Sequence, residues 1–375
     1  MPNPLAKIIS PALDFLGKEL RVLPATGGAV EDLQRPDVDE IDDALINKDV
    51  RDIDTFAEEP APETNKYTPT PPCHRTNKNV FRYFIDGSLR TYYLGTGIER
   101  NRTFPIELAQ IGSACVNRID NGSIRVHKNQ NRIILLVPKG GEGLSDSVWD
   151  ELIKITKNND IFQVVDTTQQ HGGKEIDLRT RAGGIARHKM HELEAEIINS
   201  TDGHRKDDSW VILDGAVKFG DFIKTDHLIG VAKSFDKKPQ FHFGPGKKPQ
   251  PIDVTGLIAG LPYARRTSAF SSHNGDVAFW YVRLWEQIHL DYPLMGVIKI
   301  ELPCPDKKPV SSDLVDYLSC ALVAERSVTP YGQDKRWHCH LYPIFCAEEV
   351  IKNKFYTKEV LLGAIRWRRI TTPQT

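Results

Sequence analysis

The chain has 375 residues, of which 40% are hydrophobic, and its formal net charge is −1. This length accommodates one large or two medium domains with a substantial hydrophobic core. The sequence contains no run of 18 or more apolar residues and no basic-then-apolar leader, so we expect a cytoplasmic protein that does not span a membrane.

Charge is unevenly distributed along the chain. Residues 1–60 carry a net charge of −8, whereas residues 61–375 carry +7. A basic body suits a polyanionic partner, although lysines scattered over a solvated surface would give the same sum. The six cysteines lack CxxC spacing, which indicates reduced thiols rather than a disulfide framework.

The first 78 residues predict an appendage to the folded body. Apolar residues recur at helical spacing over residues 4–22, and Pro11 is expected to kink or split this amphipathic helix. Residues 31–60 are acidic and residues 60–72 are rich in proline, which is typical of a tether. We therefore expect an N-terminal helical and acidic arm over residues 1–78, which binds a partner, and a compact domain over residues 79–375.

The body has the pattern of an α/β domain. An antiparallel opening is followed by helices that alternate with apolar strands, which favours a mixed sheet of the ribonuclease-H type flanked by helices, although other α/β folds fit. After the opening at residues 80–94, we expect strands at 110–119, 132–137, 162–165, 210–217, 228–232, 277–284 and 296–302, and helices at 145–156, 184–199 and 312–325.

Asp86 and Asp214 each end an apolar run that continues as Asp-Gly-small. A carboxylate at the tip of a buried strand is costly to desolvate, so it is usually hydrogen-bonded, paired or bound to a cation. Asp-Gly is also a common hairpin signal, so strands at 80–86 and 89–94 joined by a tight turn are an equal alternative. The unbroken apolar run before Asp214 is typical of a central strand, which favours a shared metal site.

A helix glutamate is the expected third ligand, because two divalent ions bridged by carboxylates can drive phosphodiester cleavage. Mn²⁺ and Mg²⁺ prefer such oxygen ligands. The helix before the Asp214 strand offers Glu192, Glu194 and Glu196. Glu194 lies nearest the apolar stripe of this helix, so we predict Glu194 as the ligand and keep the other two as alternatives.

Other motifs indicate less. His338 and His340 could suggest zinc, but no second ligand pair has finger-like spacing, so structural histidines fit better. No GxxxxGK[ST] segment is present, so the chain is not expected to hydrolyse ATP itself. We favour Arg265, Arg266 and Arg283 as contacts to DNA phosphates. Further candidates are Lys247, Lys248, Arg366, Arg368 and Arg369.

An ordered set of segments resembles the NurA nuclease family over about residues 79–350. The set comprises residues 84–88, the Glu-bearing helix and residues 211–216 and 229–234, and residues 279–284, 298–303 and Tyr342-Pro343 are similar to that family's later strands. The resemblance implies a ribonuclease-H-like, manganese-dependent DNA exonuclease, with single-strand endonuclease activity as an option. It also implies a homodimer that works with a hexameric HerA-type DNA translocase, in DNA repair or in defence against foreign DNA.

By position, Asp86 and Asp214 match the family's metal-binding aspartates, and Glu194 or a neighbour matches its helix glutamate. Lys233 matches a lysine that follows the next strand, either as a phosphate contact or transition-state cation or as an ordinary solvated lysine.

Two positions depart from the family's pattern. Ala216 stands where the family more often has serine, and Cys346-Ala347-Glu348-Glu349 stands where a late histidine is common. Glu348 or His340 could replace that histidine. If neither does, the chain is a weak or inactive adaptor that binds DNA and the translocase. A polynucleotide-binding module with an incidental hairpin is a third hypothesis.

Overall fold

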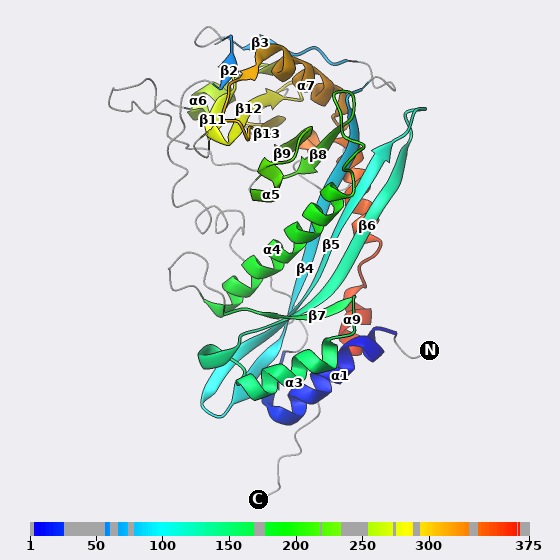
Figure 1. Cartoon of the computed structure of the whole chain (residues 1–375), viewed down its shortest axis with the longest axis vertical. Helices are drawn as coiled ribbons and strands as arrows, with labels where there is room; N and C mark the ends of the chain where they lie inside the picture. Colours follow the sequence, from blue (N-terminus) through cyan, green and yellow to red (C-terminus); the bar gives the residue numbers. More distant parts are fainter. Residues whose placement is uncertain are drawn as a thin grey trace, which may run out of the picture.

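The protein is α/β, with a twelve-stranded mixed sheet flanked by helices, which confirms the predicted class (Figure 1). The computed structural model describes residues 4–25, 57–60, 67–73, 79–168, 177–217, 220–233, 254–272, 275–287, 293–329, 337–365 and 367. The strand order is β3-β10-β12-β13-β9-β8-β4-β5-β6-β7, with β1 paired to β4 and β11 paired to β12; β2 and β14 form a separate pair.

The helices are unequal in length. Within the described residues they are α1 (Pro4–Glu19), α3 (Asp146–Thr156), α4 (Leu178–Asn199), α5 (Gly220–Ile223), α6 (Val254–Ala259), α7 (Ser312–Glu325), α8 (Tyr342–Lys352) and α9 (Lys358–Ala364), with 3-10 turns η2 (Gly140–Glu142) and η4 (Trp337–Cys339). Among them, none combines the length and the apolarity that a membrane crossing requires.

The strands fall into long and short groups. They are β1 (Arg21–Pro24), β2 (Glu58–Glu59), β3 (Thr68–Pro69), β4 (Phe81–Glu99), β5 (Arg102–Arg118), β6 (Ile124–Val137), β7 (Phe162–Asp166), β8 (Trp210–Asp214), β9 (Leu228–Ala232), β10 (Arg265–Arg266), β11 (Phe270–Ser272), β12 (Val277–Arg283), β13 (Val297–Pro303) and β14 (Val310–Ser311).

Three long antiparallel strands, β4, β5 and β6, form the spine of the molecule (Figure 1). β4 is 19 residues long and runs straight through Asp86-Gly87, so the predicted hairpin at that dipeptide is wrong. The chain reverses only after Glu99, which pairs with Arg102. β4 stays extended because β5 pairs with it throughout and because Tyr92 and other residues beyond the dipeptide are buried.

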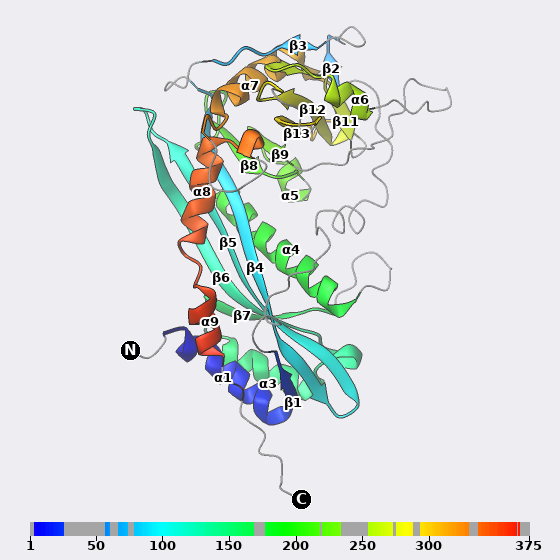
Figure 2. The ribbon, with the colours of Figure 1, turned by 180° about the vertical axis from the view of Figure 1, so that it is seen from behind.

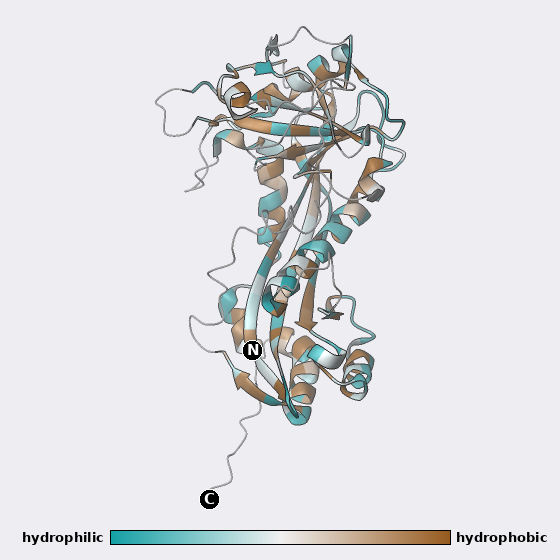
Figure 3. Ribbon diagram, turned by 90° about the vertical axis from the view of Figure 1, so that its left-hand side faces the viewer, coloured by the Kyte–Doolittle hydropathy of each residue, from teal (hydrophilic) through white to brown (hydrophobic). Residues whose placement is uncertain are grey.

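Helices cover both faces of this spine. On β5, Ala109 and Ile111 pack against α4, whereas Gly112 and Ala114 face α8, where Ile351 contacts them. Because side chains alternate between the two faces of a strand, β5 packs against α4 with one face and against α8 with the other. Figures 1 and 2 show α4 and α8 on opposite sides of β4 and β5. In Figure 3 the helices alternate hydrophobic and hydrophilic positions, as expected when one face packs on a sheet.

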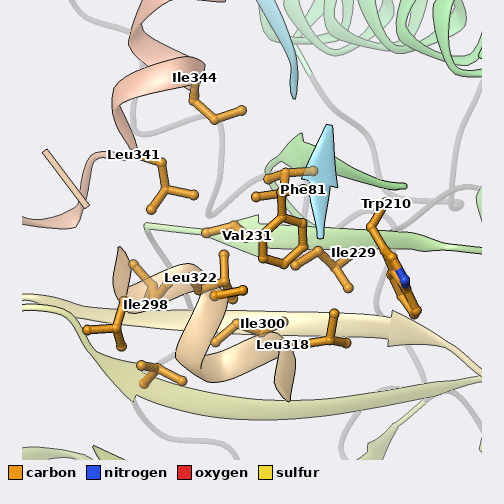
Figure 4. Packing of buried hydrophobic residues seen from close by; sticks show 14 of the residues in the cluster. Phe81, Trp210, Ile229, Val231, Ile298, Ile300, Leu318, Leu322, Leu341 and Ile344 are labelled. Carbon is orange, nitrogen blue, oxygen red and sulfur yellow. The ribbon is translucent and has the colours of Figure 1, made fainter. Parts of the chain in front are cut away.

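A hydrophobic core fixes the parallel strands. β8 lies parallel to β4, and β9 lies parallel to β8. Phe81, Ile229 and Val231 of these strands pack with Leu318 and Leu322 of α7 (Figure 4). A buried bidentate ion pair between Arg118 of β5 and Glu325 of α7, with both N–O distances 2.6 Å, holds the helix to the sheet beside this core.

The N-terminal segment belongs to the body. α1 is continuous through Pro11, and β1 pairs with residues 95–98 of β4. Leu13 and Leu16 are fully buried in a core shared with Leu361 of α9 and Phe104 of β5. An arm that binds only a partner is therefore wrong for residues 4–24, because the far end of the long strands needs an apolar cover. Most of the predicted tether, residues 31–56, 61–66 and 74–78, lies outside the described residues.

Candidate active site at the ends of three parallel strands

Asp86 and Asp214 are neighbours. The parallel ladder pairs Ile85 of β4 with Leu213 of β8, so the two aspartates are the next residues on adjacent strands. Asp214 is the last residue of β8, whereas Asp86 lies inside β4 rather than at a strand tip. Asp86 sits opposite Ala114 of β5, which faces α8, so the Asp86 side chain projects toward α8 as well.

Lys233 joins this pair from the third strand. It follows β9 directly, two residues after Val231, which is paired with Asp214. Its Nζ lies 2.8 Å from Asp214 Oδ2, and its side chain is 11% exposed. The parallel arrangement of β4, β8 and β9 therefore brings two carboxylates and one ammonium group to a single edge.

The site is electrostatically crowded. Burial raises the pKa of Asp86 well above its ordinary value, and the charges of Asp214, Glu348 and Glu194 raise it further, while Lys233 lowers it. Burial lowers the pKa of Lys233, but the charges of Asp214, Asp86 and Glu348 and the hydrogen bond to Asp214 together raise it above its ordinary value. Four titratable side chains distant in sequence thus shift the pKa of Asp86, and such clustering is common at functional sites.

Glu194 of α4 reaches the site across Gly87. Its side chain is 2% exposed, and a methyl group at Gly87 would lie 2.3 Å from Glu194 Oε1, so only glycine allows this approach. His191 Nδ1, one turn earlier, lies 2.5 Å from Glu194 Oε2 and fixes the carboxyl group.

The two alternative glutamates point elsewhere. Glu192 pairs with Lys189, with their nearest N–O distance 2.8 Å, and Glu196 pairs with Arg132 at 3.1 Å. Both carboxylates are more than a third exposed. Of the three glutamates, Glu194 is therefore the one that lies against Gly87 and whose charge acts on Asp86, whereas the other two lie on the outer faces of the helix.

Glu348 approaches from the opposite side, on α8 (Figure 2). Its charge acts on both Asp86 and Lys233, and its Oε1 accepts from Lys352 Nζ at 2.9 Å. Tyr342-Pro343 begins this helix, so the expectation of a late strand there is wrong. The charges that act most strongly on Asp86 include that of Glu348 and not that of His340, which is buried in the turn before α8.

One buried acidic residue that no sequence motif singled out, Glu301, holds the segment after Asp214. Glu301 of β13 is buried, accepts a hydrogen bond from the Val217 backbone N–H at 2.8 Å, and pairs with Lys299 at 2.6 Å. Gly230 lies directly beneath, where a methyl group would come within 2.7 Å of the Gly215 carbonyl oxygen. An acidic residue within the apolar β13 run was the available signal.

Two of the predicted DNA contacts, Arg266 and Arg283, are wrong because both side chains are buried. Arg266 is 1% exposed and pairs with Glu58 and Asp316. Arg283 is also 1% exposed and donates to backbone carbonyl groups, which include that of Leu261. A buried guanidinium with its donors engaged internally cannot reach a phosphate.

For Arg265 the contact to DNA phosphates stays a prediction. Arg265 is half-buried and donates to the Tyr67 carbonyl oxygen at 3.0 Å. The other basic candidates, Lys247, Lys248, Arg366, Arg368 and Arg369, lie outside the described residues.

The donor set fits a divalent ion by its chemistry. Carboxylate oxygens from two adjacent strands and two flanking helices are the ligands that Mn²⁺ and Mg²⁺ prefer. In the described part of the chain, no three His, Cys, Asp or Glu side chains are already gathered around one point as the ligands of an ion would be. The ammonium group of Lys233 lies against Asp214 there.

No protein-family model matches the chain, and no curated protein is significantly similar to it. The function is therefore inferred from the arrangement of side chains.

Proposed function

We propose that the chain is a divalent-metal-dependent deoxyribonuclease of the NurA type. The observation that carries the proposal is the adjacency of Asp86 and Asp214 on paired strands, with Lys233 in contact with Asp214 and with the charges of Glu348 and Glu194 acting on Asp86. Acids that repel one another in a buried place destabilise the fold, so their retention favours a role in binding a cation.

The fold supports this proposal. The order β6-β5-β4-β8-β9 consists of an antiparallel meander followed by two parallel strands. This order is the one expected of a ribonuclease-H-like sheet, with Asp214 at the end of β8 and Asp86 beside it within β4. The homodimer and the HerA-type hexameric ATPase partner, in DNA end processing or in defence against foreign DNA, are proposed from the sequence resemblance.

Each side chain has a distinct task in the proposed reaction. Asp86, Asp214 and Glu194 would hold Mn²⁺ or Mg²⁺, and Glu348 would add a carboxylate from α8. When bound, the ion supplies an activated water and neutralises charge on the phosphoryl group. His191 orients Glu194, and Glu301 holds the segment that follows Asp214. Lys233 would place a positive charge beside the cleaved phosphate.

The first prediction tests the carboxylates. Asp86→Ala and Glu194→Ala should each lower the rate of DNA cleavage in Mn²⁺ by about a thousandfold or more, because each removes a metal ligand. Glu192→Ala is the matched control, since Glu192 is a solvent-facing glutamate on the same helix. Cleavage of end-labelled single- and double-stranded DNA is measured, with circular dichroism to confirm folding. Equal cleavage by all variants and the wild type would contradict the proposal.

Binding of Mn²⁺ distinguishes the proposed nuclease from an adaptor that has lost turnover. An adaptor that lost turnover has no need of a divalent-ion site, so calorimetric titration of Mn²⁺ into the wild type should release no binding heat in that case. We expect Mn²⁺ to bind, because the negative charges of Asp86 and Asp214 repel each other and a cation would offset this repulsion.

A further inference from the structure

Lys233 is a cation that lies within the cluster of Asp86, Asp214, Glu194 and Glu348. Its ammonium group contacts Asp214 Oδ2 at 2.8 Å, and its charge acts on Asp86 as well. The side chain is 11% exposed, so water screens this contact only partly. Lys352 is a weaker rival, because it pairs with Glu348 and is 39% exposed.

An ammonium group and a divalent ion compete for Asp214 Oδ2, which Lys233 Nζ already contacts at 2.8 Å. Two cations at contact distance repel each other strongly in a buried setting. A divalent ion held between Asp86 and Asp214 is therefore favoured when the Lys233 ammonium group moves away from Oδ2. The four-carbon stem of lysine permits such a movement while the backbone stays on β9.

We propose that Lys233 is the internal counter-ion of the metal-free site, and that a divalent ion binds by displacing its ammonium group from Asp214. The inference rests on the proposed function, since it assumes that the carboxylates take a divalent ion. The released ammonium group then lies next to the bound ion, where an anionic phosphate would receive it. The Lys233 side chain thus contacts Asp214 in the metal-free protein and the substrate phosphate in the metal-bound protein.

If the metal ion displaces Lys233, a substitution of Lys233 should change the affinity for the metal ion and the rate of cleavage in opposite directions. Replacing Lys233 with an uncharged residue removes the competitor, so the ion should bind more tightly. The same replacement removes the positive charge beside the phosphate, so cleavage should slow. A lysine that served only as a phosphate contact would leave the affinity for the metal ion unchanged.

The second prediction measures that affinity directly. Mn²⁺ alone is titrated by calorimetry into the full-length wild type and into Lys233→Met, which keeps an unbranched side chain without the charge. We expect Lys233→Met to bind Mn²⁺ at least about tenfold more tightly than the wild type. Lys189→Met removes the same charge from a lysine paired with Glu192 on the outer face of α4, and should change the affinity by less than about twofold.

The outcomes separate the inference from the proposed function. Equal or weaker Mn²⁺ binding by Lys233→Met, with normal binding by the wild type, overturns the displacement and leaves the nuclease proposal in place. Absence of Mn²⁺ binding by the wild type overturns both. If Lys233→Met does not fold, Lys233→Gln serves instead, because its amide can still donate to Asp214 without a charge; the same tightening is expected, and its absence overturns the inference.

Discussion

At the residue scale, Asp86 carries a conflict between function and stability. It is 6% exposed, and its pKa lies well above the ordinary value of 3.8 because burial and the neighbouring carboxylates disfavour its charged form. A folded protein that holds a proton more tightly than the unfolded chain loses stability as pH rises from the unfolded pKa to the folded one. Above the folded pKa this loss is complete.

The third prediction follows from this loss of stability with rising pH. Without metal, Asp86→Asn should be more stable than the wild type at neutral pH, and its advantage should shrink as pH falls toward 4. Each pH unit between the ordinary and the raised pKa is worth about 1.4 kcal/mol. Urea denaturation in a chelator, from about pH 4 to pH 8, measures the difference. Asp202→Asn is the control, because Asp202 is 80% exposed; parallel pH profiles for both variants and the wild type would refute the prediction.

Residues were predictable when their local pattern carried the information. Asp86 and Asp214 stood out because each interrupts an apolar run, and helical geometry distinguished Glu194 from its neighbours. Arg266 was misread because its partner, Glu58, is 208 residues away in the sequence. Glu301 was missed for a similar reason, since its partner Val217 lies 84 residues away. No local pattern encodes such pairs.

At the element scale, regular periodicity predicted the bounds of some strands and helices. It did not predict where the chain reverses direction. The strand at 228–232 and the helix at 312–325 have the observed bounds. The β4 strand was cut in two because Asp-Gly favours a turn, but pairing with β5 along its whole length overrides that local preference. The position of Asp86 beside Asp214 depends on this continuity, because it places Asp86 inside a strand that pairs with β8.

The fourth prediction concerns the segment after β8, which Glu301 anchors from β13. Glu301→Ala leaves the buried Val217 N–H without its acceptor, so Asp214 should lose its fixed position. We expect kcat to fall about 10- to 100-fold with little change in KM, as is typical when a group that orients a ligand is removed. Steady-state cleavage kinetics in Mn²⁺ measure both constants.

The matched variant is Glu301→Gln, which keeps an acceptor oxygen for the Val217 N–H. It should restore most of the kcat, because the hydrogen bond and not the charge positions the segment. If Glu301→Gln were as slow as Glu301→Ala, the charge paired with Lys299 would be the property that matters. Unchanged kcat in Glu301→Ala would show that Asp214 needs no such anchor.

At the scale of the whole molecule, the long spine separates two packed regions (Figures 1 and 2). One end holds the parallel strands, α7 and the candidate site. The other end is closed by α1, α3 and α9, which share a hydrophobic core with β4, β5 and β6. The expectation of a partner-binding arm over residues 1–78 therefore changes for α1, because this helix packs in the core of the folded body.

The fifth prediction tests this role of α1. Leu13→Ala removes a fully buried side chain from the core at the far end and should lower the free energy of unfolding by about 2–5 kcal/mol. Leu23→Ala is the control, because Leu23 lies in the same N-terminal segment but is 48% exposed. Urea denaturation gives both values, and cleavage assays at low temperature report on the site. Because the core at the far end lies away from Asp86 and Asp214, the folded fraction of Leu13→Ala should cleave DNA at the wild-type rate; a stability loss no larger than that of Leu23→Ala would mean that α1 does not hold this end together.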